Sequence, residues 1–290
     1  MITGSIVALV TPMQLDGAVD WPALEKLIEH HIAAGTNALG VVGTTGESAT
    51  LTVPEHCEVI QFTVNQSAGR VPVVAGTGSN STHEAIELTV SAAQAGADAS
   101  LLVTPYYNRP TQEGLYQHFC AVAAAVNIPI ILYNVPGRTG VDLSNETTLK
   151  LSQIDNIIAI KDATGDVERG AELIQALSDS FAVYSGDDPT ALALMRRGAK
   201  GNVSVTANVA AAQMATMCRL ALAGDFDAAV KIDERMRPLH KALFLEPNPI
   251  PVKWALQQQG YIDGGIRLPL TTLSDSYYAE VKTAMEYLNA

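Results

Sequence analysis

The chain has 290 residues and a formal net charge of −12, from 18 Lys and Arg against 30 Asp and Glu. Nucleic acids and anionic membranes bind basic patches, so this charge argues against either partner. Hydrophobic residues make up 48% of the chain, which is enough for a sizeable core, and the length suits one large α/β domain. We therefore expect a globular protein that binds small molecules, including anions at a local positive site.

The cysteines and the amino terminus indicate a compartment. Cys57, Cys120 and Cys218 lie far apart and none belongs to a C-x-x-C pair, so neither a zinc site nor a disulfide framework is indicated. The first basic residue is Lys26, which makes the amino terminus a poor signal peptide. No apolar run approaches the length of a membrane span. We expect a cytoplasmic protein with reduced thiols and no membrane partner.

Short segments rich in Val, Ile and Leu alternate with longer segments that have apolar residues at helical spacing. The eight predicted strands are 6–10, 38–42, 71–75, 99–103, 128–133, 157–160, 181–184 and 202–205. Strands that alternate with helices imply right-handed βαβ units and a parallel sheet. Eight such units predict a closed (β/α)8 TIM barrel, which we place in residues 1–224.

Capping signals mark where several helices begin. Asp20 is expected to cap the first helix. Thr52 and Glu55 have the spacing of a capping box, as do Ser81 and Glu84. Each signal follows a predicted strand, as the barrel requires.

The pattern changes from residue 225. No further convincing strand is present, and helices are predicted at 226–245, 252–259 and 273–288. Between the first two lies EPNPIP, whose prolines forbid a continuous helix. We interpret residues 225–290 as a C-terminal helical region packed on the barrel.

In such barrels the working residues follow the carboxyl ends of the strands. The segments at those positions are GTTGES (43–48), GTGSN (76–80), TPYYNRP (104–110), YNVPGRTG (133–140), KDATGD (161–166) and SGDD (185–188). These segments contain the candidate site residues.

Lys161 ends the apolar segment 157–160. A lysine after a strand more commonly reaches solvent than serves chemistry, so this segment alone leaves both alternatives open. Tyr133 also ends an apolar strand, where a core aromatic with a solvated hydroxyl is the alternative. The backbone N–H groups of GTTGE could bind a carboxylate, and Arg138 could bind a second one through two hydrogen bonds. An ordinary turn and a solvated arginine are the competing interpretations.

Several catalytic motifs are missing from the sequence. It contains no H-E-x-x-H, no G-x-S-x-G and no Walker lysine loop, so we expect no metal and no cofactor. The remaining lysine, hydroxyls and arginine suit a Schiff-base enzyme that acts on a small keto acid. An amine must be neutral to attack a carbonyl, and burial favours its neutral form.

Five motifs taken together resemble the dihydrodipicolinate synthase (4-hydroxy-tetrahydrodipicolinate synthase) family. They are GTTGES, the pair Tyr106–Tyr107, YNVPGRTG, IKDATGD and EPNPIPVKWAL, and the similarity covers essentially the whole chain. The resemblance implies that Lys161 forms a Schiff base with pyruvate. The enamine would then attack the aldehyde of aspartate semialdehyde and the adduct would cyclise, a step towards diaminopimelate and lysine.

The resemblance also implies residue roles. Tyr133 would donate and accept protons near the imine, and Thr44 would relay protons between Tyr133 and Tyr107. In this family that last tyrosine reaches in from a neighbouring subunit of a homotetramer, a dimer of tight dimers. Thr45 and the loop amides would hold the pyruvate carboxylate, and Arg138 the semialdehyde carboxylate.

Two further groups of positions follow from the resemblance. The backbone carbonyls of Gly186 and Val203 would lie near the lysine. An allosteric site for L-lysine, a feedback inhibitor, would use Ser48, Ala49, His56, Asn80, Glu84 and Tyr106. Val53 stands where a second histidine is expected, a departure that could weaken inhibition. Glu84 could instead complete the Ser81 capping box, and His56 could be a helix-surface residue.

Two other functions compete with this one. A related lyase, such as N-acetylneuraminate lyase or a keto-deoxy-sugar-acid aldolase, would share Lys161, Tyr133 and GTTGE. Arg138 favours a short carboxylated aldehyde over a polyhydroxylated chain. A non-catalytic barrel that senses pyruvate or lysine is the second alternative, and the intact lysine and hydroxyl set argues against it.

Overall fold

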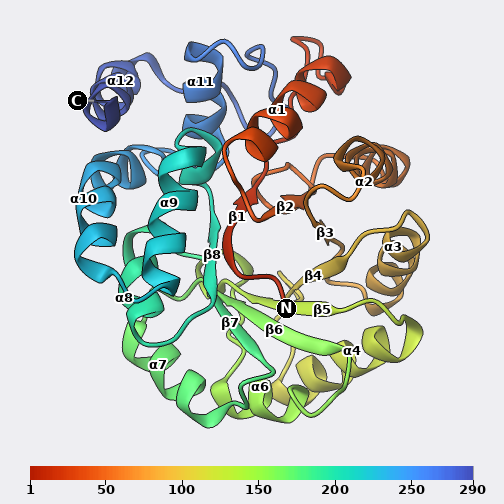
Figure 1. Cartoon of the computed structure of the whole chain (residues 1–290). Helices are drawn as coiled ribbons and strands as arrows, with labels where there is room; N and C mark the ends of the chain where they lie inside the picture. Colours follow the sequence, from red (N-terminus) through yellow and green to blue (C-terminus); the bar gives the residue numbers. More distant parts are fainter. Residues whose placement is uncertain (290) are drawn as a thin grey trace.

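The computed structural model describes residues 1–289, in which eight parallel strands close into a barrel in chain order (Figure 1). The strands are β1 (Gly4–Ala8), β2 (Ala38–Val41), β3 (Val73–Gly76), β4 (Ala99–Val103), β5 (Ile130–Asn134), β6 (Ile157–Asp162), β7 (Ala182–Ser185) and β8 (Gly201–Ser204). The predicted (β/α)8 barrel is confirmed, and the strand ends differ from the predicted ones by two residues at most.

Helices surround the barrel and cover the outer faces of the strands (Figure 1). They are α1 (Trp21–Ala33), α2 (Val53–Ser67), α3 (Thr82–Gln94), α4 (Gln112–Ala125), α5 (Pro136–Thr139), α6 (Asn145–Leu151), α7 (Val167–Ala176), α8 (Ala191–Arg196) and α9 (Ala211–Leu222). Short 3-10 turns, η1 (Asp188–Thr190) and η2 (Thr206–Asn208), follow β7 and β8. The alternation of strand and helix is the one that the apolar periodicity predicted.

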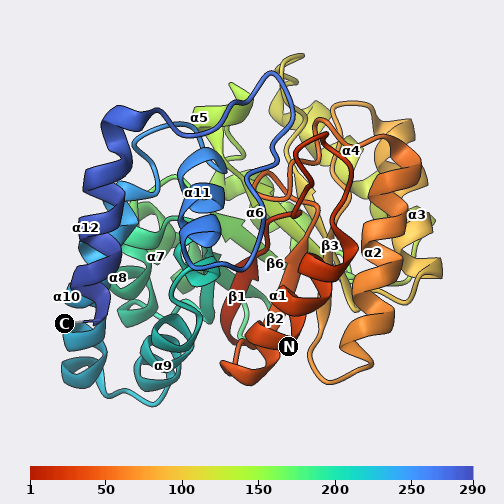
Figure 2. The same cartoon turned by 90° about the horizontal axis from the view of Figure 1, so that it is seen from above.

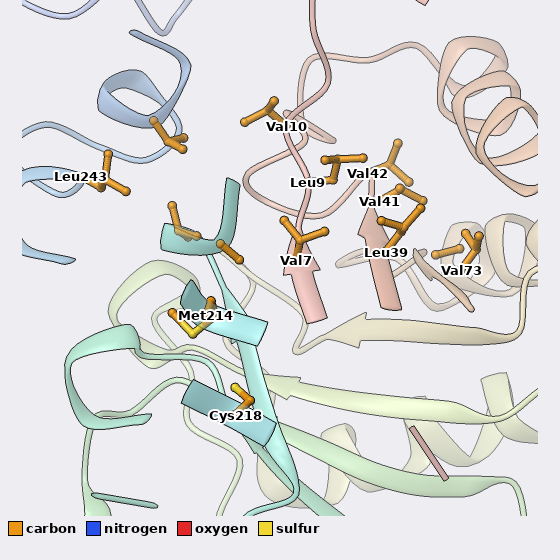
Figure 3. Close-up of a cluster of buried hydrophobic side chains, with 14 of the residues drawn as sticks. Val7, Leu9, Val10, Leu39, Val41, Val42, Val73, Met214, Cys218 and Leu243 are labelled. Carbon is orange, nitrogen blue, oxygen red and sulfur yellow. The ribbon is translucent and has the colours of Figure 1, made fainter. Parts of the chain in front are cut away.

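The strands are buried on both faces, which explains their near-continuous apolar sequences. Outward-facing residues pack under the helices, and Figure 3 shows part of this core, which includes Val7 of β1, Leu39 of β2 and Met214 of α9. Inward-facing residues form a second cluster inside the barrel, which includes Ala159, Tyr133 and Tyr184. Lys161, two residues after Ala159, therefore points into the barrel.

The capping predictions are confirmed at two helices and half confirmed at a third. The Asp20 carboxylate accepts the N–H of Ala23, 3.0 Å away. Thr52 and Glu55 form a reciprocal capping box. At α3 the Ser81 hydroxyl accepts the N–H of Glu84, but the Glu84 carboxylate bonds the hydroxyl of Ser79 instead of returning to Ser81. The reciprocal half of that box is wrong, because the preceding serine competes for the carboxylate.

Three helices follow the barrel, as predicted: α10 (Phe226–Ala242), α11 (Ile250–Gln258) and α12 (Tyr278–Asn289), the last preceded by the turn η3 (Asp275–Tyr277). Figures 1 and 2 show α10 and α12 together on one flank of the barrel, next to α9. Their buried side chains belong to the same apolar cluster as those of the barrel helices. The division at residue 224 into two domains stays a prediction. Within residues 1–289 no helix has the length and hydrophobicity needed to cross a membrane.

Candidate active site

Lys161 lies near the carboxyl end of β6 and points inward. Its side chain is buried, with 6% of the residue exposed, and Nζ lies 4.0 Å from the centroid of the Tyr133 ring. The two residues are direct neighbours in the register of β5 and β6, and Tyr184 is the neighbour on β7. The alternative in which Lys161 escapes to solvent is thereby excluded. The amine is instead enclosed within the barrel, beside an aromatic ring.

Gly186 makes room for this lysine. A Cβ at residue 186 would lie 2.7 Å from Cε of Lys161 and 2.8 Å from Cβ of Ala163. Any side chain there would displace the lysine, so glycine is required after β7. Residue 186 thus lies against the lysine side chain, and the role expected of its carbonyl stays a prediction.

A small cavity of about 20 Å³ lies beside the lysine. Its lining comprises Ala8, Leu9, Gly40, Val41, Gly43, Thr44, Thr45, Gly46, Leu101, Tyr133, Lys161 and Val203. Strands distant in sequence thus bring together Lys161, Tyr133, Thr44, Thr45 and Val203, all of which the sequence singled out.

The loop GTTGES has a strained backbone. Val42 before it and Glu47 within it have positive φ angles of 47° and 57°, uncommon for residues that carry a Cβ. The Thr11 hydroxyl, from the segment that follows β1, donates to the Gly46 carbonyl at 2.7 Å and holds the loop. A Cβ at Gly46 would lie 3.0 Å from Cα of Val42, so the chain folds back on itself there. Thr44 and Thr45 lie between Val42 and Gly46, so these constraints fix both threonines.

A larger cavity of about 390 Å³ adjoins the small one, and Thr44 lines both. Arg138, on α5 directly after β5, lines its other side. The arginine side chain donates from Nη2 to the carbonyl of Asn248 at 3.3 Å. Arg138 is exposed, so its remaining donors can reach a ligand in this cavity.

Most of the residues predicted for lysine binding line this larger cavity. These are Ser48, Ala49, His56, Glu84 and Tyr106, together with the unexpected Val53. His56 is 5% exposed and donates from Nε2 to the Gly76 carbonyl at 2.8 Å, so it is no helix-surface residue. Burial lowers the pKa of His56, and the ring is therefore neutral at pH 7. Asn80 is not part of the lining, and its carbonyl accepts from the Asn108 amide at 2.8 Å.

Tyr107 is the predicted residue that this chain does not bring to the lysine. It is 90% exposed and has φ 73°, while its N–H donates to the Thr139 carbonyl at 3.2 Å. Its side chain lines neither cavity. In the single chain Tyr107 therefore makes no contact with the Lys161 cavity.

Four residues of the site were missed by the sequence analysis. Asn248 is buried and donates from Nδ2 to the Thr45 hydroxyl at 2.9 Å. Glu47 forms a buried ion pair with Lys253, and the backbone N–H of Arg267 donates to the same carboxylate at 3.2 Å. The motif EPNPIPVKWAL contains two of them, but spacing alone does not show that it reaches a loop some 200 residues earlier. Among the described residues, no group of three or more His, Cys, Asp or Glu could hold a metal ion.

Known proteins resemble this chain over its whole length. The model of the dihydrodipicolinate synthetase family matches residues 1–288. The 4-hydroxy-tetrahydrodipicolinate synthase of Stutzerimonas stutzeri (strain A1501) is 61% identical over 285 residues, 98% of each chain. That of Pseudomonas aeruginosa is 59% identical over the same length and coverage.

Solved structures agree with the sequence relatives. The chloride-inhibited dihydrodipicolinate synthase of Acinetobacter baumannii, complexed with pyruvate, superposes with a TM-score of 0.99 and 58% identity, covering 100% of this chain and 99% of that one. The enzyme of Cyanidioschyzon merolae with lysine bound gives a TM-score of 0.96 and 42% identity, covering 99% and 98%. The chain therefore belongs to the dihydrodipicolinate synthetase family.

Proposed function

We propose that the protein is a lyase that condenses pyruvate with L-aspartate 4-semialdehyde, the 4-hydroxy-tetrahydrodipicolinate synthase reaction of diaminopimelate and lysine biosynthesis. The observation that carries the proposal is the buried Lys161 amine beside Tyr133, in a cavity lined by Thr44 and Thr45. Relatives with 61% and 60% sequence identity to this chain bear that enzyme name. Because the reaction is a step in amino-acid biosynthesis, we expect the protein in the cytoplasm. Cell fractionation would test this location.

The chemistry follows from the placement of the amine. Neutral Lys161 attacks the keto carbon of pyruvate and loses water to give the imine. Removal of a methyl proton gives the enamine, whose carbon attacks the aldehyde of the second substrate. The amine of that substrate then attacks the imine carbon, closes the ring and releases Lys161. Tyr133, next to Nζ, is positioned to donate and accept these protons.

Two anchors would hold the two carboxylates. Thr45 accepts a hydrogen bond from Asn248, so its own O–H remains available to donate to the pyruvate carboxylate alongside the loop amides. Arg138 would hold the semialdehyde carboxylate from the larger cavity. Thr44, which lines both cavities, would pass protons between them, and Gly186 and Val203 would present their carbonyls near the lysine.

Borohydride reduction tests the Schiff base. With pyruvate present, reduction should add one pyruvate-derived mass to Lys161, because the imine is converted to a stable amine. Lys161→Ala should lose the adduct and most of the activity while the barrel still folds. Lys231→Ala, which removes an exposed lysine on α10, should keep both. An unmodified Lys161 peptide from active wild-type protein would refute the mechanism.

Arg138 separates this function from that of a related sugar-acid lyase. Arg138→Ala should raise the KM for aspartate semialdehyde by about 30-fold, the equivalent of about 2 kcal/mol for hydrogen bonds to a charged group. Pyruvate trapping on Lys161 should persist, because the first substrate does not need the arginine. Steady-state kinetics with each substrate varied in turn would measure both effects. Sugar-acid cleavage by the wild type without the condensation would favour the related lyase instead.

We infer that Tyr107 completes the site of a neighbouring subunit in a homotetramer built as a dimer of tight dimers. The support is its 90% exposure on a loop beside the larger cavity, which Tyr106 lines. Lys161→Ala and Tyr107→Phe chains should each be weakly active alone but should regain activity when co-expressed. A mixed dimer then contains one site with both native side chains. Unrecovered activity in verified mixed oligomers would show that Tyr107 does not act across subunits.

We further propose that L-lysine binds the larger cavity and inhibits the enzyme, with the lining residues Ser48, Ala49, His56, Glu84 and Tyr106 as its contacts. Asn80 lies outside the lining, next to the lining residue Ser79, and would contact the ligand only at the edge of the cavity. The Glu84 carboxylate, which lines this cavity, would bind the ammonium group. Glu84→Gln should raise the lysine concentration for half-inhibition by about tenfold or more. Val53→His should lower it by adding a polar contact. Inhibition curves measured at fixed pyruvate would decide, and a Glu84→Gln curve identical to wild type would contradict the proposed site.

A further inference from the structure

A buried ion pair joins the C-terminal region to the GTTGES loop. Lys253 lies on α11 and pairs with Glu47, and the two side chains are only 4% and 1% exposed. Of the lysine and arginine ion pairs formed within residues 1–289, this is the one in which both side chains are buried. The pair bridges segments about 200 residues apart.

Burial of both charges indicates a role other than general stability. Removing two charges from water costs free energy, and the attraction between them repays this cost only with good geometry and further hydrogen bonds. Apolar residues of similar volume would stabilise the fold at least as well. Here the second carboxylate oxygen of Glu47 accepts the Arg267 N–H at 3.2 Å, so both oxygens are fixed. The glutamate is held in one position and one orientation.

That position matters because Glu47 belongs to the strained loop. Its φ of 57° is sustained only while the surrounding contacts require it. The same C-terminal segment also supplies Asn248, whose amide bonds the Thr45 hydroxyl at 2.9 Å. The loop that carries Thr44 and Thr45 is therefore held by residues of the C-terminal region as well as by the barrel.

We propose that Lys253 and Glu47 are positioning residues for the pyruvate site. Their ion pair keeps the GTTGES loop in the conformation in which Thr45 and the loop amides bind the pyruvate carboxylate. This inference rests on the proposed function and adds to it a residue of α11 that touches no substrate. Loss of the pair lets the loop relax and weakens pyruvate binding, whereas Arg138, which lies on α5 and bonds the Asn248 carbonyl and not Glu47, keeps its position.

Lys253→Met tests the positioning role, because it leaves the buried Glu47 without its ion-pair partner. The KM for pyruvate should rise by about tenfold or more, since small displacements of binding groups have large kinetic effects. The KM for aspartate semialdehyde should change by less than about twofold. Glu47→Gln, which keeps an acceptor for Arg267, should give a smaller rise. Steady-state kinetics measure the KM for each substrate, and borohydride trapping as a function of pyruvate concentration measures pyruvate binding separately.

The double variant Lys253→Met/Glu47→Met separates positioning from stability. With both charges removed, the thermal midpoint should return to the wild-type value or above, while the KM for pyruvate stays raised. Asp233→Asn is the matched control: this buried carboxylate pairs with Arg237 on α10 and makes no bond to the loop. It should lower the thermal midpoint and leave the KM for pyruvate within about twofold.

Three outcomes would overturn the inference, and they differ from failure of the proposed function. An unchanged KM for pyruvate in Lys253→Met, or a double variant that recovers KM together with stability, would reduce the pair to a structural role. If the double variant does not fold, Glu47→Gln decides, and an unchanged KM in that variant also overturns the inference. Wild-type protein that forms no pyruvate adduct would refute the function and the inference together.

Discussion

Closure of the barrel by β8 on β1 is the constraint on which the rest of the structure depends. Gly4 and Gly201 are direct partners in this pairing, and a Cβ at Gly201 would overlap the Gly4 carbonyl oxygen. With the ring closed, the carboxyl ends of eight strands meet in one small area. Lys161 of β6, Tyr133 of β5 and Val203 of β8 then line a single cavity. An open sheet would leave the first and last strands at opposite edges and would separate the GTTGES loop from β8.

The interior of the closed barrel sets the chemistry of the amine. The inner cluster around Lys161 is apolar and aromatic, so the lysine has little water about it. An amine enclosed in this way can reach the carbonyl of a keto acid bound in the barrel. Space for the side chain comes from Gly186, and hydroxyls enter from the loop after β2. The site thus combines a buried amine with hydroxyl groups on one side, an arrangement suited to proton transfer around the proposed imine.

The C-terminal helices contribute more than an additional layer. Asn248 contacts both Thr45 and Arg138, so one residue connects the two expected carboxylate anchors. Lys253 and Arg267 converge on Glu47, and Arg267 also pairs with Glu55 at the start of α2. These contacts hold a loop whose backbone angles at Val42 and Glu47 are unfavourable in isolation. The conformation of the loop is therefore a property of the whole chain.

The sequence by itself determined the order of the elements, because apolar periodicity and capping residues act over a few neighbours. The predictable features were the eight strands, the caps at Asp20 and Thr52, and the strand ends that carry Lys161 and Tyr133. Family motifs added the reaction and most of the residues that converge on the two cavities. Only the tertiary structure decided whether Lys161 is buried, that Glu84 bonds Ser79 instead of closing a capping box, and that Glu47 finds its partner on α11. Burial, competition between hydrogen-bond partners and ion pairing across some 200 residues depend on where distant segments meet, and local sequence patterns do not contain that information.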